Sequence, residues 1–275
     1  MRNLIVNADD FGVTPGVCAG IRRAHAEGVV TTTTAMMNMP FATDELRRTH
    51  VETPGLGLGV HLTLTAGRPL SPEPSVAGLL DSAGNFLRPP EFVRRLETLR
   101  LEEVEREWVC QIEAFLDLGL ELDHLDSHHH TSYLSPSLLD LMLELASRFG
   151  CAIRPPFTED ETALAREMLA NFPPEGAAHA RDALQASVVM HADRLYVSFF
   201  NTTATLERLL EILATLPEGT SEIMCHPGLR DDELRRVSDY SDMRQQELEC
   251  LVDERVRQSV RERGIHLCRY SDLHV

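Results

Sequence analysis

The stretch Leu4-Ile5-Val6-Asn7-Ala8-Asp9-Asp10 opens the chain with a short apolar run that ends in two adjacent carboxylates. Such a run predicts a buried strand with polar groups at its carboxyl end. Seven further runs follow, separated by longer segments with helical spacing. The eight runs cover residues 4–7, 29–36, 56–62, 122–126, 152–154, 195–199, 222–225 and 265–269. This alternation is typical of βα units around a parallel sheet, so we expect an α/β fold with about eight strands.

The helical segments between the runs have recognisable ends. Thr14 before Pro15 predicts an N-cap, and Gly28 stands where a C-cap glycine is expected. Trp108 belongs to an apolar stripe with spacings of three and four, which predicts a core position. Residues 65–90 and 155–192 interrupt the alternation. We expect them to be insertions, either specificity loops or plain surface loops.

The charge balance is acidic, with 26 basic side chains against 43 acidic ones and a formal net charge of −17. Phosphate backbones and anionic lipid surfaces are poor partners for this charge, so we expect no nucleic-acid or membrane partner. All the basic residues are arginines, which excludes a Schiff-base lysine and a P-loop lysine. The first run turns acidic early, and no later run approaches a membrane span in length. We therefore expect a cytoplasmic protein.

Potential metal ligands and proton carriers follow four of the predicted strands. Asp9 and Asp10 end the first run, His61 lies near the end of the third, His128 follows the fourth and His226 follows the seventh. The carboxyl ends of parallel strands form the ligand-binding end of barrels and open sheets. Adjacent carboxylates repel each other unless a cation or a shared proton relieves them. A bound metal ion is the simplest solution; otherwise one Asp caps the next helix and the other is solvated.

The segment Asp123-His124-Leu125-Asp126-Ser127-His128-His129-His130 is the densest group of potential ligands in the chain. If it stays extended, its even-numbered residues share one face and His129 points to the other. His128 is the preferred ligand, Asp126 is expected to orient a neighbouring imidazole, and His130 is the reserve candidate. One carboxylate and two imidazoles would leave positions for water and substrate, as catalytic metal sites require. The alternative is a chance metal-binding run on the surface.

His226 and Arg154 complete the candidates. His226 precedes a Pro-Gly turn, which would fix the ring but leave it accessible. Its near-neutral intrinsic pKa suits proton donation to a leaving amine, although it could instead only satisfy turn carbonyls. Arg154 ends the fifth run, where it could hold a substrate carboxylate, orient Asp9 or form a surface salt bridge.

Five motifs, taken together and in this order, resemble the YdjC-like carbohydrate deacetylases, a family that includes chitooligosaccharide deacetylases. They are residues 4–12 (LIVNADDFG), 28–31 (GVVT), 59–62 (GVHL), 124–130 (HLDSHHH) and 222–227 (EIMCHP). The resemblance implies a single (β/α) barrel-like domain over residues 1–275, with seven to eight mostly parallel strands and outer helices. It also implies a metal-dependent hydrolase that removes the N-acetyl group from N-acetylglucosamine-containing small carbohydrates of the chitobiose or chitooligosaccharide type.

Carried over motif by motif, the resemblance makes Asp10, His61 and His128 the ligands of one divalent metal ion. It makes Asp9 the general base and His226 the general acid. Magnesium is the usual metal of the family and zinc the second candidate. Imidazole ligands favour zinc, whereas magnesium prefers oxygen ligands. The insertions have no recognisable match, so we expect the choice of sugar to be determined there.

Two other functions remain as alternatives at this point. A metal-dependent phosphoesterase also uses Asp and His at strand ends, but it usually needs more carboxylates and a cationic phosphate clamp. A non-catalytic sugar-binding barrel would need no base beside the proposed ligands. The sequence is compatible with either a monomer or a homodimer.

Overall fold

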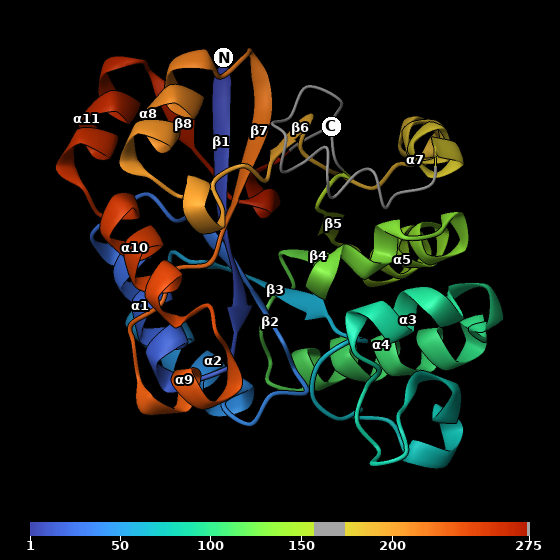
Figure 1. Ribbon diagram of the computed structural model, residues 1–275. Coiled ribbons are helices and arrows are strands. Elements are labelled where there is room, and N and C mark those ends of the chain that lie inside the picture. The colour runs from blue at the N-terminus through green and yellow to red at the C-terminus, as the bar shows by residue number, and fades with distance from the viewer. Residues whose placement is uncertain (157–173, 274–275) are drawn as a thin grey trace.

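The computed structural model describes residues 1–156 and 174–273, and within them eight strands form one sheet (Figure 1). The strands are β1 (Arg2–Phe11), β2 (Thr32–Ala35), β3 (Gly57–Leu62), β4 (His124–Ser127), β5 (Ala152–Ile153), β6 (Arg194–Tyr196), β7 (Gly219–Cys225) and β8 (Ile265–Leu267). Their order is β5-β4-β3-β2-β1-β7-β6, with β8 paired to β1. All these pairs are parallel. The predicted α/β fold is confirmed, and every strand overlaps one of the eight apolar runs.

The two ends of this strand order lie close together. A parallel bridge joins Ile153 of β5 to His191, just before β6. The N–H group of Ile153 also donates to the carbonyl oxygen of Met190 at 2.9 Å. The sheet therefore curls into a barrel-like shape. Because the strands are parallel, their carboxyl ends gather at one end of it, where the ligand site of such folds lies.

Helices cover the outside of the sheet (Figure 1). They are α1 (Pro15–Ala26), α2 (Ala42–Glu52), α3 (Pro89–Arg95), α4 (Leu101–Leu116), α5 (Pro136–Phe149), α7 (Pro174–Ala186), α8 (Leu206–Thr215), α9 (Asp232–Val237), α10 (Ser241–Leu251) and α11 (Glu254–Glu262). Short 3-10 helices are η1 (Glu73–Ser75), η2 (Ala77–Leu79), η3 (Leu96–Thr98), η4 (His128–Tyr133), η5 (Asn201–Thr203) and η6 (Tyr270–Asp272). As predicted, Thr14 caps α1, since its hydroxyl accepts the N–H group of Val17 at 3.2 Å.

The prediction that Gly28 caps the end of α1 is wrong. The C-cap is Glu27, which has right-handed helical geometry. Position 28 needs glycine for a different reason, because a Cβ atom there would lie 2.4 Å from the carbonyl oxygen of Leu251. The close approach of α10 to the α1–β2 loop, rather than backbone conformation, therefore excludes a side chain.

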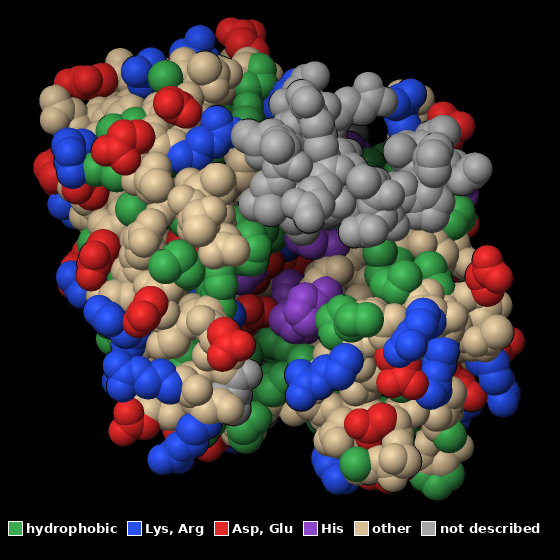
Figure 2. Space-filling model, viewed as in Figure 1, with side chains coloured by type: hydrophobic (Ala, Val, Ile, Leu, Met, Phe, Trp, Pro, Cys, Tyr) green, Lys and Arg blue, Asp and Glu red, His purple; other side chains and the backbone are tan. Residues whose placement is uncertain are grey.

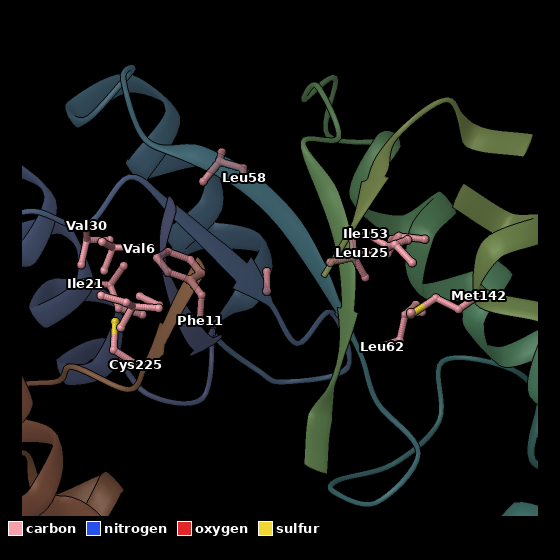
Figure 3. Close-up of a cluster of buried hydrophobic side chains, with 14 of the residues drawn as sticks. Val6, Phe11, Ile21, Val30, Leu58, Leu62, Leu125, Met142, Ile153 and Cys225 are labelled. Carbon is pink, nitrogen blue, oxygen red and sulfur yellow. The ribbon is translucent and has the colours of Figure 1, made fainter. Parts of the chain in front are cut away.

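Apolar side chains fill the space between the sheet and the helices. Figure 3 shows Ile21 of α1 beside Val6 of β1, and Met142 of α5 near Leu62 of β3; all four are fully buried. Trp108 of α4 is also fully buried, which confirms its predicted place in the core. This packing fixes the strands relative to one another and thereby fixes the end of the barrel where the polar side chains meet.

The two segments that interrupt the strand–helix alternation differ in what can be described. Residues 65–90 contain η1, η2 and an antiparallel bridge between Leu80 and Phe86. Of residues 155–192, the part at 157–173 lies outside the described residues. The assignment of the whole chain to a single domain stays a prediction. None of the helices in the described part is both long enough and apolar enough to cross a membrane.

Candidate metal and catalytic site

Two consecutive carboxylates at the end of β1 face one site, although strand alternation would send them to opposite faces. An extra residue in β1 explains this: Ala8 pairs with Thr33, but Phe11 pairs with Ala35, so the register shifts between them. Asp10 has a φ of 67°, in the left-handed region that non-glycine residues rarely adopt. This bulge aims the carboxylate of Asp10 at the histidines while Asp9 faces the barrel interior.

The structure brings together the three side chains expected to bind a metal ion. Oδ1 of Asp10 lies 3.4 Å from Nε2 of His61 and 3.1 Å from Nδ1 of His128. The two imidazole nitrogens are 3.3 Å apart. Each residue comes from the carboxyl end of a different strand, β1, β3 and β4, which is the arrangement that the positions of the predicted strands indicated.

This cluster fits a divalent cation. Ligand atoms that bind one tetrahedral ion at about 2.0–2.2 Å are roughly 3.3–3.6 Å apart, close to the spacings of the three atoms. None of the described residues donates a hydrogen bond of good geometry to the buried Oδ1 of Asp10, which is unfavourable for a carboxylate oxygen unless a cation faces it. Figure 2 shows histidine side chains with acidic neighbours in a hollow of the molecular surface.

Asp126 orients His61 for this role. Nδ1 of His61 lies 2.7 Å from Oδ1 of Asp126, and the second oxygen of Asp126 accepts the hydroxyl of Thr34 at 3.1 Å. A proton held on Nδ1 leaves Nε2 directed at Asp10. Burial lowers the pKa of His61, but the carboxylates of Asp126 and Asp10 outweigh burial and raise it to about 10. The surrounding carboxylates thus favour a positive charge at this position, either a second proton on the ring or a metal ion in place of that proton.

A second group, Asp9, His61 and Asp126, also has the spacing of a metal site. Arg154 excludes a cation there. Its guanidinium is fully buried and binds Asp9 at 2.6 and 2.8 Å and Asp126 at 2.9 Å. A metal ion among these atoms would lie against the guanidinium charge. The cluster around Asp10 is therefore the better candidate for a metal site.

Glu222 of β7 is the third carboxylate that binds Arg154, after Asp9 and Asp126. It was not identified as a site residue from the sequence. Its Oε1 accepts Nε of Arg154 at 2.8 Å, and Oε2 accepts the hydroxyl of Tyr270. The sequence did contain a signal for it. Glu222 stands two positions before Met224 in an apolar strand, and alternation places both residues on the inner face. Together, these contacts give Arg154 a carboxylate on each side.

Asp9 is held in its ionised form beside the metal-capable cluster. Oδ1 accepts hydrogen bonds from Arg154 and, at 2.8 Å, from Nδ2 of Asn7. Burial raises the pKa of Asp9, but the guanidinium of Arg154 outweighs burial and holds the pKa well below its usual range. In the part of the chain that the structure describes, Oδ2 accepts a hydrogen bond from Arg154 alone, and it faces Nε2 of His226 at 3.9 Å. This oxygen is the one that remains able to accept a proton.

Arg244 of α10 is a second site residue that the sequence did not reveal. It is buried, and its Nη2 donates to Oδ2 of Asp10. Burial raises the pKa of Asp10, but Arg244 and His128 outweigh burial and lower it well below the usual range. Nothing in the local sequence of α10 distinguishes Arg244 from the other arginines, since the contact spans 234 positions of the chain.

His226 lies beside Asp9 as expected, but its protonation differs from the expectation. Burial lowers the pKa of His226 to about 4 despite the opposing charge of Asp9, so the ring is neutral at pH 7. The ring lies against Phe200 and Tyr240, with centroids 5.2 and 5.9 Å away. Glu247 accepts the backbone N–H of His226 and, at 2.6 Å, the hydroxyl of Tyr240. The contacts of Glu247 therefore position the loop that carries His226 and do not protonate its imidazole.

The histidine run does not stay extended. β4 ends at Ser127, and His129 and His130 take left-handed φ values of 54° and 53°. The expectation that His128 and His130 share a strand face is wrong, because the strand ends before both. His130 is buried with its ring stacked on Tyr133. Among the described residues, it belongs to neither group with metal-site spacing.

Fold and site together define a class: an α/β barrel with one carboxylate and two imidazoles that have the spacing of metal ligands. A family model described as "YdjC-like protein" matches residues 3–262. Carbohydrate deacetylases from Thermoanaerobacter pseudethanolicus and Enterococcus faecalis are each 35% identical, over 273 and 277 residues. These alignments cover 99% of this chain and 100% and 98% of the two relatives. The chain belongs to the YdjC-like family, which confirms the resemblance.

Similar solved structures agree with this family assignment and with the fold. A crystal structure from Enterococcus faecalis V583, described as a cellobiose-phosphate cleavage protein, is 34% identical with a TM-score of 0.85. The match covers 100% of this chain and 99% of that one. The Xyl-CE4 domain of a xylanase from the hindgut metagenome of Trinervitermes trinervoides is 7% identical, with a TM-score of 0.51 over 97% of this chain and 86% of that one. That likeness concerns the fold alone and supports the barrel-like architecture.

Proposed function

We propose that the protein is a metal-dependent carbohydrate deacetylase. It hydrolyses the N-acetyl group of N-acetylglucosamine-containing small sugars, of the chitobiose or chitooligosaccharide type. The observation that carries the proposal is the convergence of Asp10, His61 and His128, with ligand atoms 3.1–3.4 Å apart, next to the ionised Asp9. The names of the curated relatives support the reaction class.

One divalent ion would be held by Oδ1 of Asp10, Nε2 of His61 and Nδ1 of His128. When bound, such an ion polarises the acetamide carbonyl and acidifies the attacking water. Magnesium and zinc are the two candidates, and the two imidazole ligands favour zinc over magnesium. Arg244 holds the second oxygen of Asp10, so only one carboxylate oxygen faces the imidazoles.

Asp9 acts as the general base. Arg154 holds its carboxylate in the ionised form, and among the described residues Arg154 alone donates a hydrogen bond to Oδ2. Arg154 binds both oxygens and prevents rotation of the carboxylate, which keeps Oδ2 directed toward the site. Asp9 is a weak base because of this pairing, so it depends on a water that has already been acidified.

His226 supplies the proton that the leaving amine needs. Because the ring is neutral at pH 7, it must first gain a proton, and the water proton accepted by Asp9 is the available source. Nε2 of His226 lies 3.9 Å from Oδ2 of Asp9, within reach of a small side-chain movement. The same proton is then transferred from Nε2 to the amine nitrogen as the carbon–nitrogen bond breaks.

The phosphoesterase alternative is weaker at this site. Arg154, the arginine considered as a phosphate clamp, is bound by Asp9, Asp126 and Glu222, so its charge is already neutralised. A sugar-binding barrel without catalysis does not explain why Asp9 is ionised and oriented beside the cation site. Each alternative predicts an outcome different from that of the deacetylase in the test that follows.

The test is acetate release from N,N′-diacetylchitobiose by metal-loaded wild type and by Asp9→Asn, with metal content measured for both. We expect turnover by the wild type, and a loss of about 10²–10⁴-fold in Asp9→Asn with metal retained. Hydrolysis of p-nitrophenyl phosphate without acetate release would favour the phosphoesterase. Binding of the disaccharide by metal-loaded wild type without acetate release would favour the binding barrel.

A further inference from the structure

His129 is an exposed imidazole at the rim of the site, next in sequence to the proposed ligand His128. The two rings are 3.8 Å apart between centroids. His129 and His130 both have left-handed backbone geometry, which is unfavourable for residues with side chains and persists where the surroundings impose it. This turn carries the ring of His129 away from the strand direction and leaves it exposed beside the cluster.

Thr65 fixes the orientation of this ring. Its hydroxyl lies 2.9 Å from Nδ1 of His129, and Thr65 itself is 1% exposed. Nε2, on the opposite edge of the ring, has no hydrogen-bond partner among the described residues. His129 also belongs to neither of the described groups with metal-site spacing. Metal binding therefore does not explain why the ring of His129 is held in one orientation with Nε2 free of described partners at the rim of the site.

The backbone that carries Thr65 is itself held rigidly. Gln111 of α4, fully buried, accepts the N–H of Thr63 and donates to its carbonyl oxygen, both at 2.8 Å. Asn38 donates to the carbonyl oxygen of Ala66 at 2.8 Å. The backbone is thus anchored to other parts of the fold at Thr63, before Thr65, and at Ala66, directly after it. Such pre-organisation is typical of side chains that bind a ligand.

We propose that His129 is a substrate-binding residue whose Nε2 hydrogen-bonds a hydroxyl group of the acetylated sugar. The proposal rests on the proposed function, because it assumes that the acetamide lies at the Asp10, His61 and His128 cluster. A neutral imidazole nitrogen donates or accepts according to its tautomer, and a sugar hydroxyl can do either. Thr65 would therefore link the start of the 65–90 segment to sugar recognition.

The experiment compares metal-loaded wild type with His129→Ala, His129→Gln and Thr65→Val. Acetate release is measured against concentration for N-acetylglucosamine and N,N′-diacetylchitobiose, together with the metal content of each protein. We expect His129→Ala to raise KM about tenfold, as for one lost hydrogen bond, with kcat within about threefold. His129→Gln restores part of the loss, because an amide can also donate and accept, and Thr65→Val raises KM by a smaller factor. His50→Ala, an exposed histidine on α2, is the matched control and keeps the wild-type KM.

The outcomes separate this inference from the proposed function. Wild type that releases no acetate from either sugar overturns the proposed function, and this inference with it. Active wild type with an unchanged KM in both His129→Ala and Thr65→Val overturns the inference alone. Loss of metal from His129→Ala also overturns it, because the residue would then support the cation site rather than bind sugar.

Discussion

Arg154 binds both oxygens of Asp9, through Nη2 to Oδ1 at 2.6 Å and through Nη1 to Oδ2 at 2.8 Å. Neither side chain is appreciably exposed. A fork-to-fork pair of this kind fixes the plane of the carboxylate as well as its charge. Because Asp126 and Glu222 bind the same guanidinium, one arginine neutralises and orients the acidic interior of the barrel.

Removal of Arg154 is expected to destabilise the protein strongly. Arg154→Met leaves Asp9, Asp126 and Glu222 buried without their partner, and breaking a buried ion pair on one side costs about 3–5 kcal/mol. The free energy of unfolding, measured by urea denaturation, checks this. The matched control is Arg230→Met, whose ion pair with Asp242 is half exposed and should cost less than about 1 kcal/mol. Equal effects of the two substitutions would contradict the assigned role of Arg154.

Substitution of the proposed ligands should abolish metal binding. We expect His61→Ala and His128→Ala to lose bound metal, since each removes one of three protein ligands. Asp126→Asn should weaken metal affinity by about 10–100-fold, because it disturbs only the orientation of His61. Elemental analysis and metal titration provide the measurements, with His50→Ala as the control. Full metal content in both histidine variants would refute the ligand assignment.

The strands were predictable because each is a short apolar run between longer helical segments. Their carboxyl ends also gave the approximate position of the site, since parallel strands bring His61 and His128 to the same end of the barrel. Strand alternation could not predict the direction of the Asp10 side chain. Strict strand alternation would place the side chains of Asp9 and Asp10 on opposite faces of the sheet. The left-handed backbone at Asp10 directs both side chains to the same site.

The remaining site residues depend on contacts between distant parts of the chain. Arg244 reaches Asp10 from α10, and no local pattern marks an arginine that will be buried by tertiary packing. The pKa of His226 was expected near its intrinsic value because sequence shows the residue type but not its burial, and burial is the main cause of the shift to about 4.

Core packing gives a third testable expectation, from two residues of the same helix. Trp108 of α4 is fully buried, whereas Leu101 is 39% exposed. Trp108→Ala should lower the free energy of unfolding by about 3–5 kcal/mol, since the cavity cannot fully collapse. Leu101→Ala should lower it by less than about 1 kcal/mol. Chemical denaturation of both variants decides the matter, and a small loss for Trp108→Ala would show that α4 packs more loosely than described.

The contribution of Glu247 to stability should fall as pH rises between about 4.5 and 7. Burial raises the pKa of this carboxyl to about 7, although the hydroxyl of Tyr240 and the N–H of His226 lower it. In this window the folded protein holds a proton that the unfolded chain has lost, so the contribution is present at low pH and disappears as pH passes the folded pKa. The shift corresponds to about 3 kcal/mol.

Urea denaturation of metal-free wild type and Glu247→Gln across pH 4.5–8 measures the difference in the free energy of unfolding between the two proteins. We expect that difference to move against the wild type as pH rises, whereas Glu249→Gln, an exposed glutamate on the same helix, should follow the wild type. Parallel stability curves for wild type and Glu247→Gln would mean that Glu247 is already ionised in the folded protein at pH 4.5.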